Sequence, residues 1–413
     1  MKILLSNYRY FISGGPERYL FSIKEIFERN KTEVFPFSVK SGNNEKTEWE
    51  DYFLSSVSSN DSTYFQGYKK DLKTVVKTLE RAFYSPEGFL KARRYVMAIK
   101  PDIVYSLHFL NKMSPSIIDG FKSFGLPVVV RLSDFGLICP QAHLFCGDQI
   151  CEECIGGSLF NAVKNKCIQD SVVGSLIKYF AWNLHRMAGS IDRIDAFVSP
   201  SKFTIRKYVE AGFSEKKFRH IQTFIDSDKI EPSYSDDDYI LYFGRLAKEK
   251  GAHLLLDAYN KIKGNKPRLM VIGDIGGSAY SADLVNKYSA SAEFIEFMPK
   301  TKLIGYIQRA KFVVIPSVCY DNLPNALLES FACGKAVIAS GHGCFNEFVK
   351  EGETGLLFEP NSVDALKEKI VWAMENPLQI KEMGMNAREV VESEHAPQKH
   401  YETLMELFTS LLN

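Results

Sequence analysis

Short buried-strand patterns alternate with helical patterns twice along the chain, and this alternation most limits the folds that the sequence can adopt. In the first half, apolar runs separated by helical periodicity occur at 2–5, 102–107, 127–131 and 196–199. In the second half they occur at 239–243, 268–272, 294–297, 312–315 and 336–339. Because repeated βα units form parallel sheets, we expect an α/β chain with two Rossmann-like, doubly wound domains that face a central cleft.

A segment with neither pattern separates the two halves. It contains a proline, three serines and three consecutive aspartates, a composition that packs poorly and is typical of a linker. A length of 413 residues suits two domains of about 200 residues each. We expect an N-terminal domain with a Cys-rich insertion, a linker, a C-terminal domain, and a last helix that packs back on the first domain, at 1–225 (insertion 139–167), 226–238, 239–390 and 391–413.

Composition and charge exclude several classes of protein. The formal net charge is +1, so no overall field favours a nucleic-acid partner. The apolar run at the amino terminus, Ile3–Leu5, is too short for the core of a signal peptide, and no uncharged apolar stretch of about 18 residues predicts a spanning helix. We therefore expect a cytoplasmic protein that binds no nucleic acid.

Basic side chains follow the first strand expected in the second domain. Strand 239–243 leads into Gly244 and Arg245, with Lys250 and Gly251 shortly after. A planar guanidinium and an ammonium point charge together suit a diphosphate, and the glycines let the backbone approach a ligand closely. The alternative is a solvated basic loop.

A second group of polar residues follows the fourth strand of that domain. Asp321, Asn322, Leu323 and Pro324 precede a helix that contains Glu329. Pro324 suits the first helical position, so the helix amino end, which favours an anion, lies beside Asp321. The helix is apolar on most sides, so the carboxylate of Glu329 needs a partner, such as ribose hydroxyls. A structural ion pair is the alternative.

In this order, the motifs resemble the retaining glycosyltransferases of family 4, which have the GT-B fold. The resemblance rests on Gly-Arg-Leu-x-x-x-Lys-Gly around Arg245, on Asp321 with Glu329 eight positions later, and on Gly14-Gly15-Pro16 near the start. Ser199-Pro200-Ser201 and the segment from Glu347 to Phe358 support it. The resemblance covers nearly the whole chain and includes bacterial enzymes of surface-polysaccharide synthesis.

The resemblance assigns roles to the donor-binding residues. Arg245 and Lys250 would bind the pyrophosphate of a UDP-sugar or GDP-sugar, Glu329 the ribose hydroxyls, and Asp321 the transferred sugar. Asn322, Leu323 and Pro324 would belong to the same site, and the backbone at Gly14 and Gly15 would face the diphosphate from the opposite domain. The implied reaction moves the sugar to a saccharide or lipid-linked acceptor with retention of configuration and without a catalytic metal.

The chain departs from the family at one catalytic position. The family commonly has a His after the strand equivalent to 127–131, where this sequence has Ser133, followed by Asp134. A serine cannot supply the charge or the donor geometry of an imidazole. His108, after the preceding strand, compensates if it points into the cleft, and an ordinary structural role is the alternative.

Five cysteines lie between Cys139 and Cys167, and they include a Cys-x2-Cys pair. Such a pair with flanking cysteines suits tetrahedral zinc. The resemblance favours Cys139, Cys151, Cys154 and Cys167 as structural zinc ligands and leaves Cys146 or His143 spare. Buried free thiols and a disulfide remain the alternatives.

The stretch 64–100 is strongly basic, with nine Lys or Arg residues against Asp71, Glu80 and Glu87. Aromatic residues are interspersed among them. A basic amphipathic surface would hold the protein at the inner face of a membrane, where a lipid-linked acceptor lies. The alternative is a solvated helical face.

Two other functions are consistent with parts of the sequence. A sugar-nucleotide epimerase with the same architecture would need acid and base groups on both sides of the sugar, and the sequence identifies no such set. A zinc module that binds nucleic acid would need basic residues among the cysteines, whereas residues 147–156 contain Asp148, Glu152 and Glu153 and no Lys or Arg.

Overall fold

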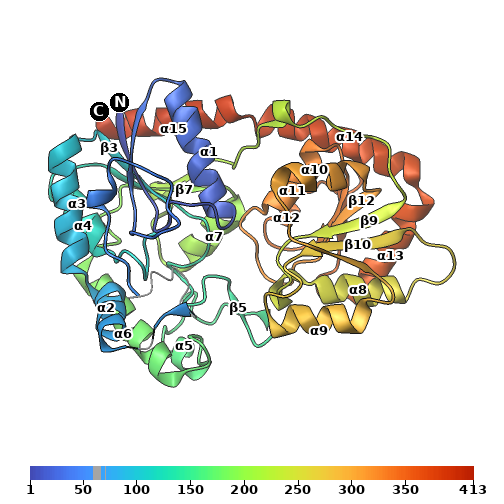
Figure 1. Ribbon diagram of the computed structural model, residues 1–413, viewed down its shortest axis with the longest axis horizontal. Helices are drawn as coiled ribbons and strands as arrows, with labels where there is room; N and C mark the ends of the chain where they lie inside the picture. The colour runs from blue at the N-terminus through green and yellow to red at the C-terminus, as the bar shows by residue number, and fades with distance from the viewer. Residues whose placement is uncertain (59–66, 70) are drawn as a thin grey trace.

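The structure is a computed structural model that describes residues 1–58, 67–69 and 71–413. The chain forms two α/β halves that lie side by side, each built on a parallel sheet of six strands (Figure 1). This confirms the predicted fold class of two doubly wound, Rossmann-like sheets. Residues 64–66 and Lys70, which belong to the predicted basic stretch, lie outside the described residues.

The first sheet has the strand order β2-β1-β3-β4-β7-β8. Its strands are β1 (Lys2–Ser6), β2 (Glu33–Phe37), β3 (Ile103–Ser106), β4 (Val128–Arg131), β7 (Ala196–Ser199) and β8 (Phe218–His220). In β1, Leu4 packs into the core on one face of the sheet, while Ile3 and Leu5 pack into the core on the other. Because both faces are buried, the strand is a continuous apolar run rather than an alternating one.

Helices cover both faces of this sheet. One face packs against α1, and the other packs against α3, α4 and α7. The α-helices of this half are α1 (Gly15–Arg29), α2 (Leu72–Phe83), α3 (Pro86–Ile99), α4 (Ser116–Lys122), α5 (Asn161–Lys164), α6 (Val172–Ala188) and α7 (Lys202–Glu210). A short antiparallel hairpin, β5 (Phe145–Cys146) with β6 (Gln149–Ile150), lies in the Cys-rich insertion.

The second sheet has the strand order β11-β10-β9-β12-β13-β14. Its strands are β9 (Tyr239–Phe243), β10 (Arg268–Gly273), β11 (Glu293–Glu296), β12 (Phe312–Ile315), β13 (Val337–Ser340) and β14 (Gly355–Phe358). The helices of this half are α8 (Ala252–Asn260), α9 (Ala279–Tyr288), α10 (Lys300–Arg309), α11 (Asn325–Ala332), α12 (Phe345–Phe348), α13 (Val363–Glu375) and α14 (Pro377–Glu394). Their apolar sides form two cores, one on each face of the sheet.

Three strands that the sequence patterns did not predict, β2, β8 and β14, all lie at sheet edges. An edge strand has one neighbour instead of two, so its sequence is less uniformly apolar. β2 even contains Pro36, which a central strand excludes because proline donates no ladder hydrogen bond. The edge position therefore explains the mixed sequences of β2 and β8, whereas β14 is an apolar run that the sequence patterns missed.

The chain returns to the first half at its carboxyl end. After α14, which packs on the second sheet, α15 (Pro397–Leu412) packs beside α1, and its Leu404 and Phe408 are fully buried with side chains of β1 and β3 (Figure 1). His400 is buried in the same contact. Its Nδ1 lies 2.7 Å from the carbonyl oxygen of Gln222, and its Nε2 lies 2.9 Å from the hydroxyl of Tyr19.

The docking of α15 makes stability depend on pH. Burial lowers the pKa of His400 from 6.5 to about 3. Below pH 6.5 the imidazole of His400 therefore binds a proton in the unfolded chain but not in the folded protein. The contribution of the buried neutral ring to the free energy of unfolding is complete above pH 6.5 and is lost progressively as the pH falls toward 3. The slope is about 1.4 kcal/mol per pH unit. The free energy of unfolding is measured in urea at several pH values between 3 and 6.5. Its slope against pH should be smaller for His400→Gln than for the unchanged protein, by the amount that corresponds to one proton. Equal slopes would contradict the assignment.

Candidate functional site in the cleft between the sheets

The loops at the carboxyl ends of the parallel strands carry the residues predicted for the site. The first half contributes Gly14 and Gly15 after β1, His108 after β3, and Ser133 and Asp134 after β4; the second half contributes Arg245 after β9 and Asp321 after β12. The two halves meet at this edge, because a Cβ added to Gly15 would lie only 3.1 Å from the side-chain amide of Asn325. Open α/β sheets bind ligands at this edge.

Lys250 and Asp321 form an ion pair that is mostly shielded from water. The ammonium of Lys250 donates to Oδ1 of Asp321, and only 23% and 12% of the two side chains are exposed. Burial by itself raises the pKa of Asp321, but Lys250 outweighs it and holds that pKa below its ordinary value. Burial likewise opposes the charge of Lys250, yet Asp321 raises the pKa of Lys250 above its usual range. Both groups therefore stay charged at neutral pH.

A glycine sets the position of this pair. Gly251 has φ 71, the left-handed region that favours glycine, and a Cβ there would lie 1.8 Å from the carbonyl oxygen of Pro316. This close approach brings the loop after β9 against the segment after β12, so that Lys250 reaches Asp321. The motif from Arg245 to Gly251 therefore supplies basic side chains and also a glycine that the packing against Pro316 requires.

His342 lies beside the pair and was not identified from the sequence. Its Nε2 donates to the carbonyl oxygen of Ser317 at 2.8 Å, and its Nδ1 is buried without a hydrogen-bond partner among the described residues. Burial lowers the pKa of His342, so the neutral ring presents a lone pair at Nδ1. The signal that could have found it is Gly341-His342-Gly343, directly after β13 at the same sheet edge.

Glu329 is buried, as the apolar helix around it predicted. Its carboxylate lies 3.4 Å from the guanidinium of Arg18, in the opposite half, and 3.5 Å from the ammonium of Lys300. The structural ion pair that the sequence left as an alternative is therefore present. Neither cation was predicted from the sequence to pair with Glu329. Pro324 is the N-cap of α11, with an extended ψ of 133, and the helix begins one residue later than predicted.

Two helix amino ends face each other near these charges. α1 begins at Gly15 after an extended Gly14, without a side-chain cap, and α11 begins at Asn325, also without one. Gly15 and Asn325 are in close contact across the cleft. Uncapped amino ends present free N–H groups and a positive dipole end.

Arg245 is more exposed than Lys250, with 62% of its side chain accessible and its guanidinium 3.2 Å from Glu249.

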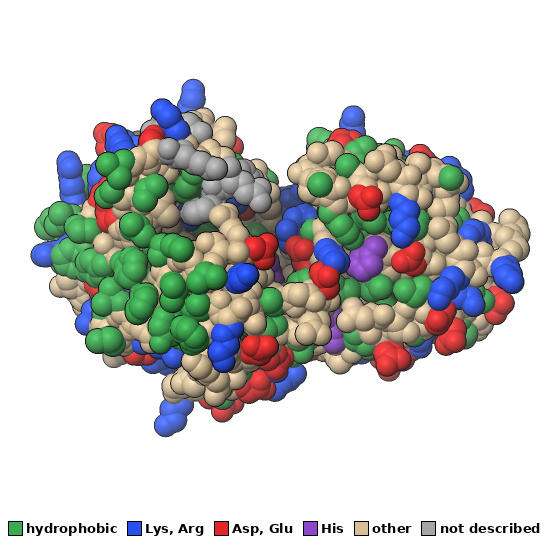
Figure 2. Space-filling model, turned by 90° about the horizontal axis from the view of Figure 1, so that it is seen from below, with side chains coloured by type: hydrophobic (Ala, Val, Ile, Leu, Met, Phe, Trp, Pro, Cys, Tyr) green, Lys and Arg blue, Asp and Glu red, His purple; other side chains and the backbone are tan. Residues whose placement is uncertain are grey.

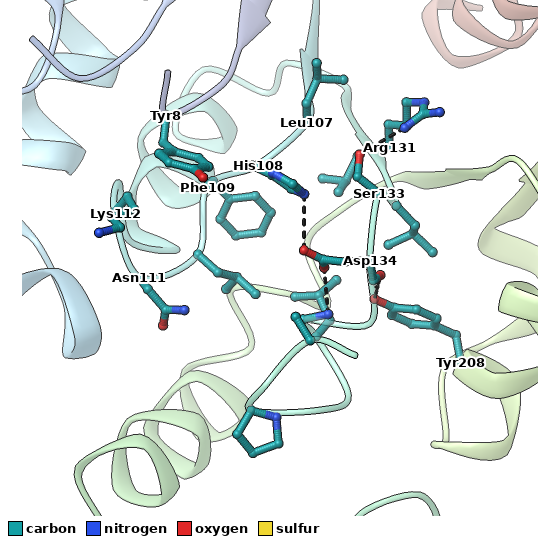
Figure 3. Close-up of a pocket in the computed structure, with 17 residues that line it drawn as sticks. Tyr8, Leu107, His108, Phe109, Asn111, Lys112, Arg131, Ser133, Asp134 and Tyr208 are labelled. Atoms are coloured by element: carbon teal, nitrogen blue, oxygen red, sulfur yellow. Dashed lines mark hydrogen bonds and ion pairs between the residues drawn. The ribbon is translucent and has the colours of Figure 1, made fainter. Parts of the chain in front are cut away.

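The first half contributes a cavity of about 210 Å³ at the ends of β3 and β4 (Figure 3). Within it, Nε2 of His108 lies 3.3 Å from Oδ2 of Asp134, and the other oxygen of Asp134 accepts from the backbone N–H of Gly136 at 2.7 Å. Burial by itself raises the pKa of Asp134, but His108 outweighs it and holds that pKa below its ordinary value. The structure thus brings His108 and Asp134 together.

Ser133 has a different partner from these two. Its hydroxyl accepts from the guanidinium of Arg131 at 2.9 Å. The backbone just before it is tied to the second half, because Nδ2 of Asn322 donates to the carbonyl oxygen of Leu132 at 2.6 Å. Oδ1 of Asn322 accepts from the hydroxyl of Thr204 at 2.7 Å. Asn322 therefore connects the cavity to the loop that carries Asp321.

The cysteines of the insertion are close in space. Cys139 is buried, the other four are partly buried, and all are free. Burial, followed by the neighbouring thiols, raises the pKa of Cys154 to about 11 and that of Cys167 to about 12. Over residues 1–58, 67–69 and 71–413, no group of three or more His, Cys, Asp or Glu side chains is arranged to hold a metal ion. No such group includes Cys139, Cys151, Cys154 and Cys167, and zinc binding by this set stays a prediction.

Replacing Gly251 tests the packing that positions the ion pair. Gly251→Ala and Gly264→Ala both place a side chain in the left-handed region, at φ 71 and 84, which costs about 1–2 kcal/mol. Only Gly251→Ala also meets a backbone oxygen, so its total loss of unfolding free energy should reach at least about 3 kcal/mol. Gly264 has nothing within 4 Å of an added Cβ and is the matched control. Equal losses in urea unfolding would contradict this reading.

The sequence of the second half is similar to a known protein family. The family described as "Glycosyl transferases group 1" matches residues 224–390. An uncharacterized glycosyltransferase of Methanocaldococcus jannaschii is 31% identical over 190 residues, 45% of this chain and 52% of that protein. A GDP-mannose-dependent phosphatidylinositol monomannoside mannosyltransferase of Corynebacterium glutamicum is 24% identical, over 53% of this chain and 62% of its own length. The chain thus spans about half to two thirds of these relatives.

Solved structures are similar over the whole chain. Sucrose-phosphate synthase from Thermosynechococcus elongatus has a TM-score of 0.71 at 17% identity, and the match covers 99% of this chain and 98% of that one. The Anabaena protein HepE, solved with UDP-glucose, has a TM-score of 0.68 at 17% identity, over 99% and 100%. Residues 224–390 are therefore similar in sequence to the group 1 glycosyltransferases, and the whole chain has the GT-B fold of these structures.

Proposed function

We propose that the chain is a retaining glycosyltransferase of the family 4 type, which moves a sugar from a nucleoside-diphosphate donor to a saccharide or lipid-linked acceptor. The observation that carries the proposal is the meeting of two uncapped helix amino ends, α1 and α11, beside the buried Lys250–Asp321 pair. Such an arrangement favours a diphosphate between the two halves. The likeness of residues 224–390 to group 1 glycosyltransferases supports it.

The residues of the second half suit the parts of a UDP-sugar or GDP-sugar. Lys250, Arg245 and the amino end of α11 take the diphosphate, with Gly14 and Gly15 opposite. Asn322, Leu323 and Pro324 form the loop that leads into α11. These groups stabilise the negative charge that develops on the departing diphosphate, where fixed donors in a shielded site act most strongly.

The two buried carboxylates have separate roles. Glu329 receives the ribose hydroxyls, because it lies inside α11 between Arg18 and Lys300. Asp321 receives a hydroxyl of the transferred sugar through Oδ2, which is buried and has no hydrogen-bond partner among the described side chains and backbone. Lys250 holds the other oxygen and so fixes the direction of the carboxylate.

The cavity of the first half receives the acceptor side of the reaction. The acceptor hydroxyl attacks the anomeric carbon from the face that the diphosphate leaves, so the new bond keeps the original configuration. Asp134 orients His108, which takes the place of the histidine that Ser133 replaces, and Ser133 itself remains engaged with Arg131. The proposed setting is cell-surface polysaccharide synthesis at the inner face of the membrane.

Replacing Arg245 tests the donor site. Losing a charge-assisted contact costs about 1.5–3 kcal/mol, so Arg245→Ala should weaken binding of UDP or GDP roughly tenfold to a hundredfold. Arg268→Ala is the matched control, because Arg268 is equally exposed, at 61% against 62%, but lies at the amino end of β10. Calorimetry would measure both affinities. Unchanged affinity for Arg245→Ala, or an equal loss in both variants, contradicts the assignment.

Isosteric variants separate the two carboxylates. Glu329→Gln should weaken the bare nucleoside diphosphate, since ribose is common to every donor. Asp321→Asn should instead reduce turnover of the intact donor much more than it weakens the bare nucleotide, because only the transferred sugar loses its contact. The assay is release of nucleoside diphosphate that depends on added acceptor, which also distinguishes transfer from epimerisation. Equal effects of Asp321→Asn on affinity and turnover would show that its role is misassigned.

A further inference from the structure

α6 turns an apolar side to solvent. Val173, Phe180, Leu184 and Met187 are exposed by 67%, 56%, 41% and 85%, and their spacing of seven, four and three residues places them along one side of the helix. The opposite side, which includes Ser175, Ala181 and Trp182, is buried against the first half. An ordinary surface helix has the reverse arrangement, with its polar side in water.

α2, which packs against α6, continues this apolar surface. Its Leu72, Val75, Val76 and Leu79 follow helical spacing and are likewise exposed. Figure 2 shows hydrophobic side chains gathered over one face of the N-terminal half. We call the solvent-facing sides of α2 and α6 the α2–α6 face. Contiguous apolar surface of this kind marks an interaction site on a soluble domain.

The charges on the helices at this face have one predominant sign. Helices α2, α5 and α6 contain six Lys or Arg residues and a single acidic residue, Glu80. Arg81 and Lys178 are buried, while Lys73, Lys164 and Arg186 remain exposed. The sequence predicted a basic surface over 64–100, which includes α2. α6 was not part of that prediction, and its contribution is apolar.

We propose that the α2–α6 face binds the surface of an anionic lipid bilayer, with its apolar side chains in the acyl boundary and its basic side chains at the headgroups. Helices with an apolar side and basic flanks lie in the plane of a membrane in this way. Among the helices that the structure describes, none is long and apolar enough to cross a membrane.

Charge favours lipid over a second copy of the chain as the occupant. In a twofold dimer the same patch faces itself, so the basic residues around one α2–α6 face would meet those of the other and repel them. Anionic headgroups instead neutralise these residues while the acyl boundary covers the apolar side chains. The proposal does not depend on glycosyl transfer.

The buried side of α6 also reaches the cavity of the candidate site. Lys178 donates to Oδ1 of Asn111 at 2.7 Å, and Asn111 lines the cavity that holds His108 and Asp134. One helix thus separates the α2–α6 face from this cavity. Bound at this face, the protein would hold its acceptor cavity close to the lipid surface.

Co-sedimentation of the full chain with vesicles tests the proposal. The vesicles contain phosphatidylcholine alone or phosphatidylcholine mixed with anionic phosphatidylglycerol. The test variant is Leu184→Asp with Met187→Asp. The matched control is Leu378→Asp with Met385→Asp, two side chains of α14 that are exposed by 79% and 45%. All four positions face solvent, so both variants should keep the melting temperature of the unchanged protein.

The unchanged protein should sediment with the mixed vesicles, and less with phosphatidylcholine alone. The α6 variant should bind the mixed vesicles at least about tenfold more weakly, because two inserted apolar groups become charged, and the α14 variant should bind normally. Absence of binding by the unchanged protein, or equal binding by all three, overturns the proposal. A concentration-dependent dimer that the α6 variant abolishes, in protein that binds no vesicles, identifies a second copy as the occupant and also overturns it.

Discussion

The crossing of the chain between the two halves is the constraint on which the cleft depends. Two segments pass from one half to the other, one after β8 and one between α14 and α15. They form hydrogen bonds with each other. The N–H of Ile225 donates to the carbonyl oxygen of His395 at 3.0 Å, and Nδ1 of His395 donates to the carbonyl oxygen of Thr223 at 2.7 Å. Burial lowers the pKa of His395, so its ring stays neutral. A paired crossing of this kind fixes which edges of the sheets face each other.

The site combines buried charges from both halves. Glu329 comes from the second half, and its partner Arg18 comes from the first. A carboxylate so deeply buried is costly unless a cation compensates it, and removing one member of such a pair leaves the other unpaired. Lys250 and Asp321 satisfy the same requirement within the second half. The cleft therefore carries two sets of paired, buried charges.

Sequence patterns predicted the two sheets because central strands of parallel sheets are apolar on both faces, as in β1 and β9. They missed the edge strands β2 and β8, whose sequences are less apolar, and they also missed β14, although it is an apolar run. They placed Asp321, Glu329, Arg245 and Lys250 in the loops and the helix at one sheet edge. They could not predict that Asp134 would hold His108, that Arg131 would engage Ser133, or that Arg18 would reach Glu329, because these contacts join segments far apart in the sequence. The zinc prediction rests on the spacing of the cysteines, and spacing does not determine how four thiols are oriented.

Glu347 illustrates how the halves hold each other closed. From the second half, its carboxylate accepts from the backbone N–H groups of Lys202 and Phe203, at 3.0 and 3.1 Å, and so covers the first turn of α7 in the first half. If the halves separate, water replaces the carboxylate as the acceptor of these two N–H groups, at a net cost of about 1 kcal/mol for each hydrogen bond. Breaking these two hydrogen bonds does not require either sheet to unfold. Rotation of one half about the paired crossing would break these two bonds and leave the core of each half intact.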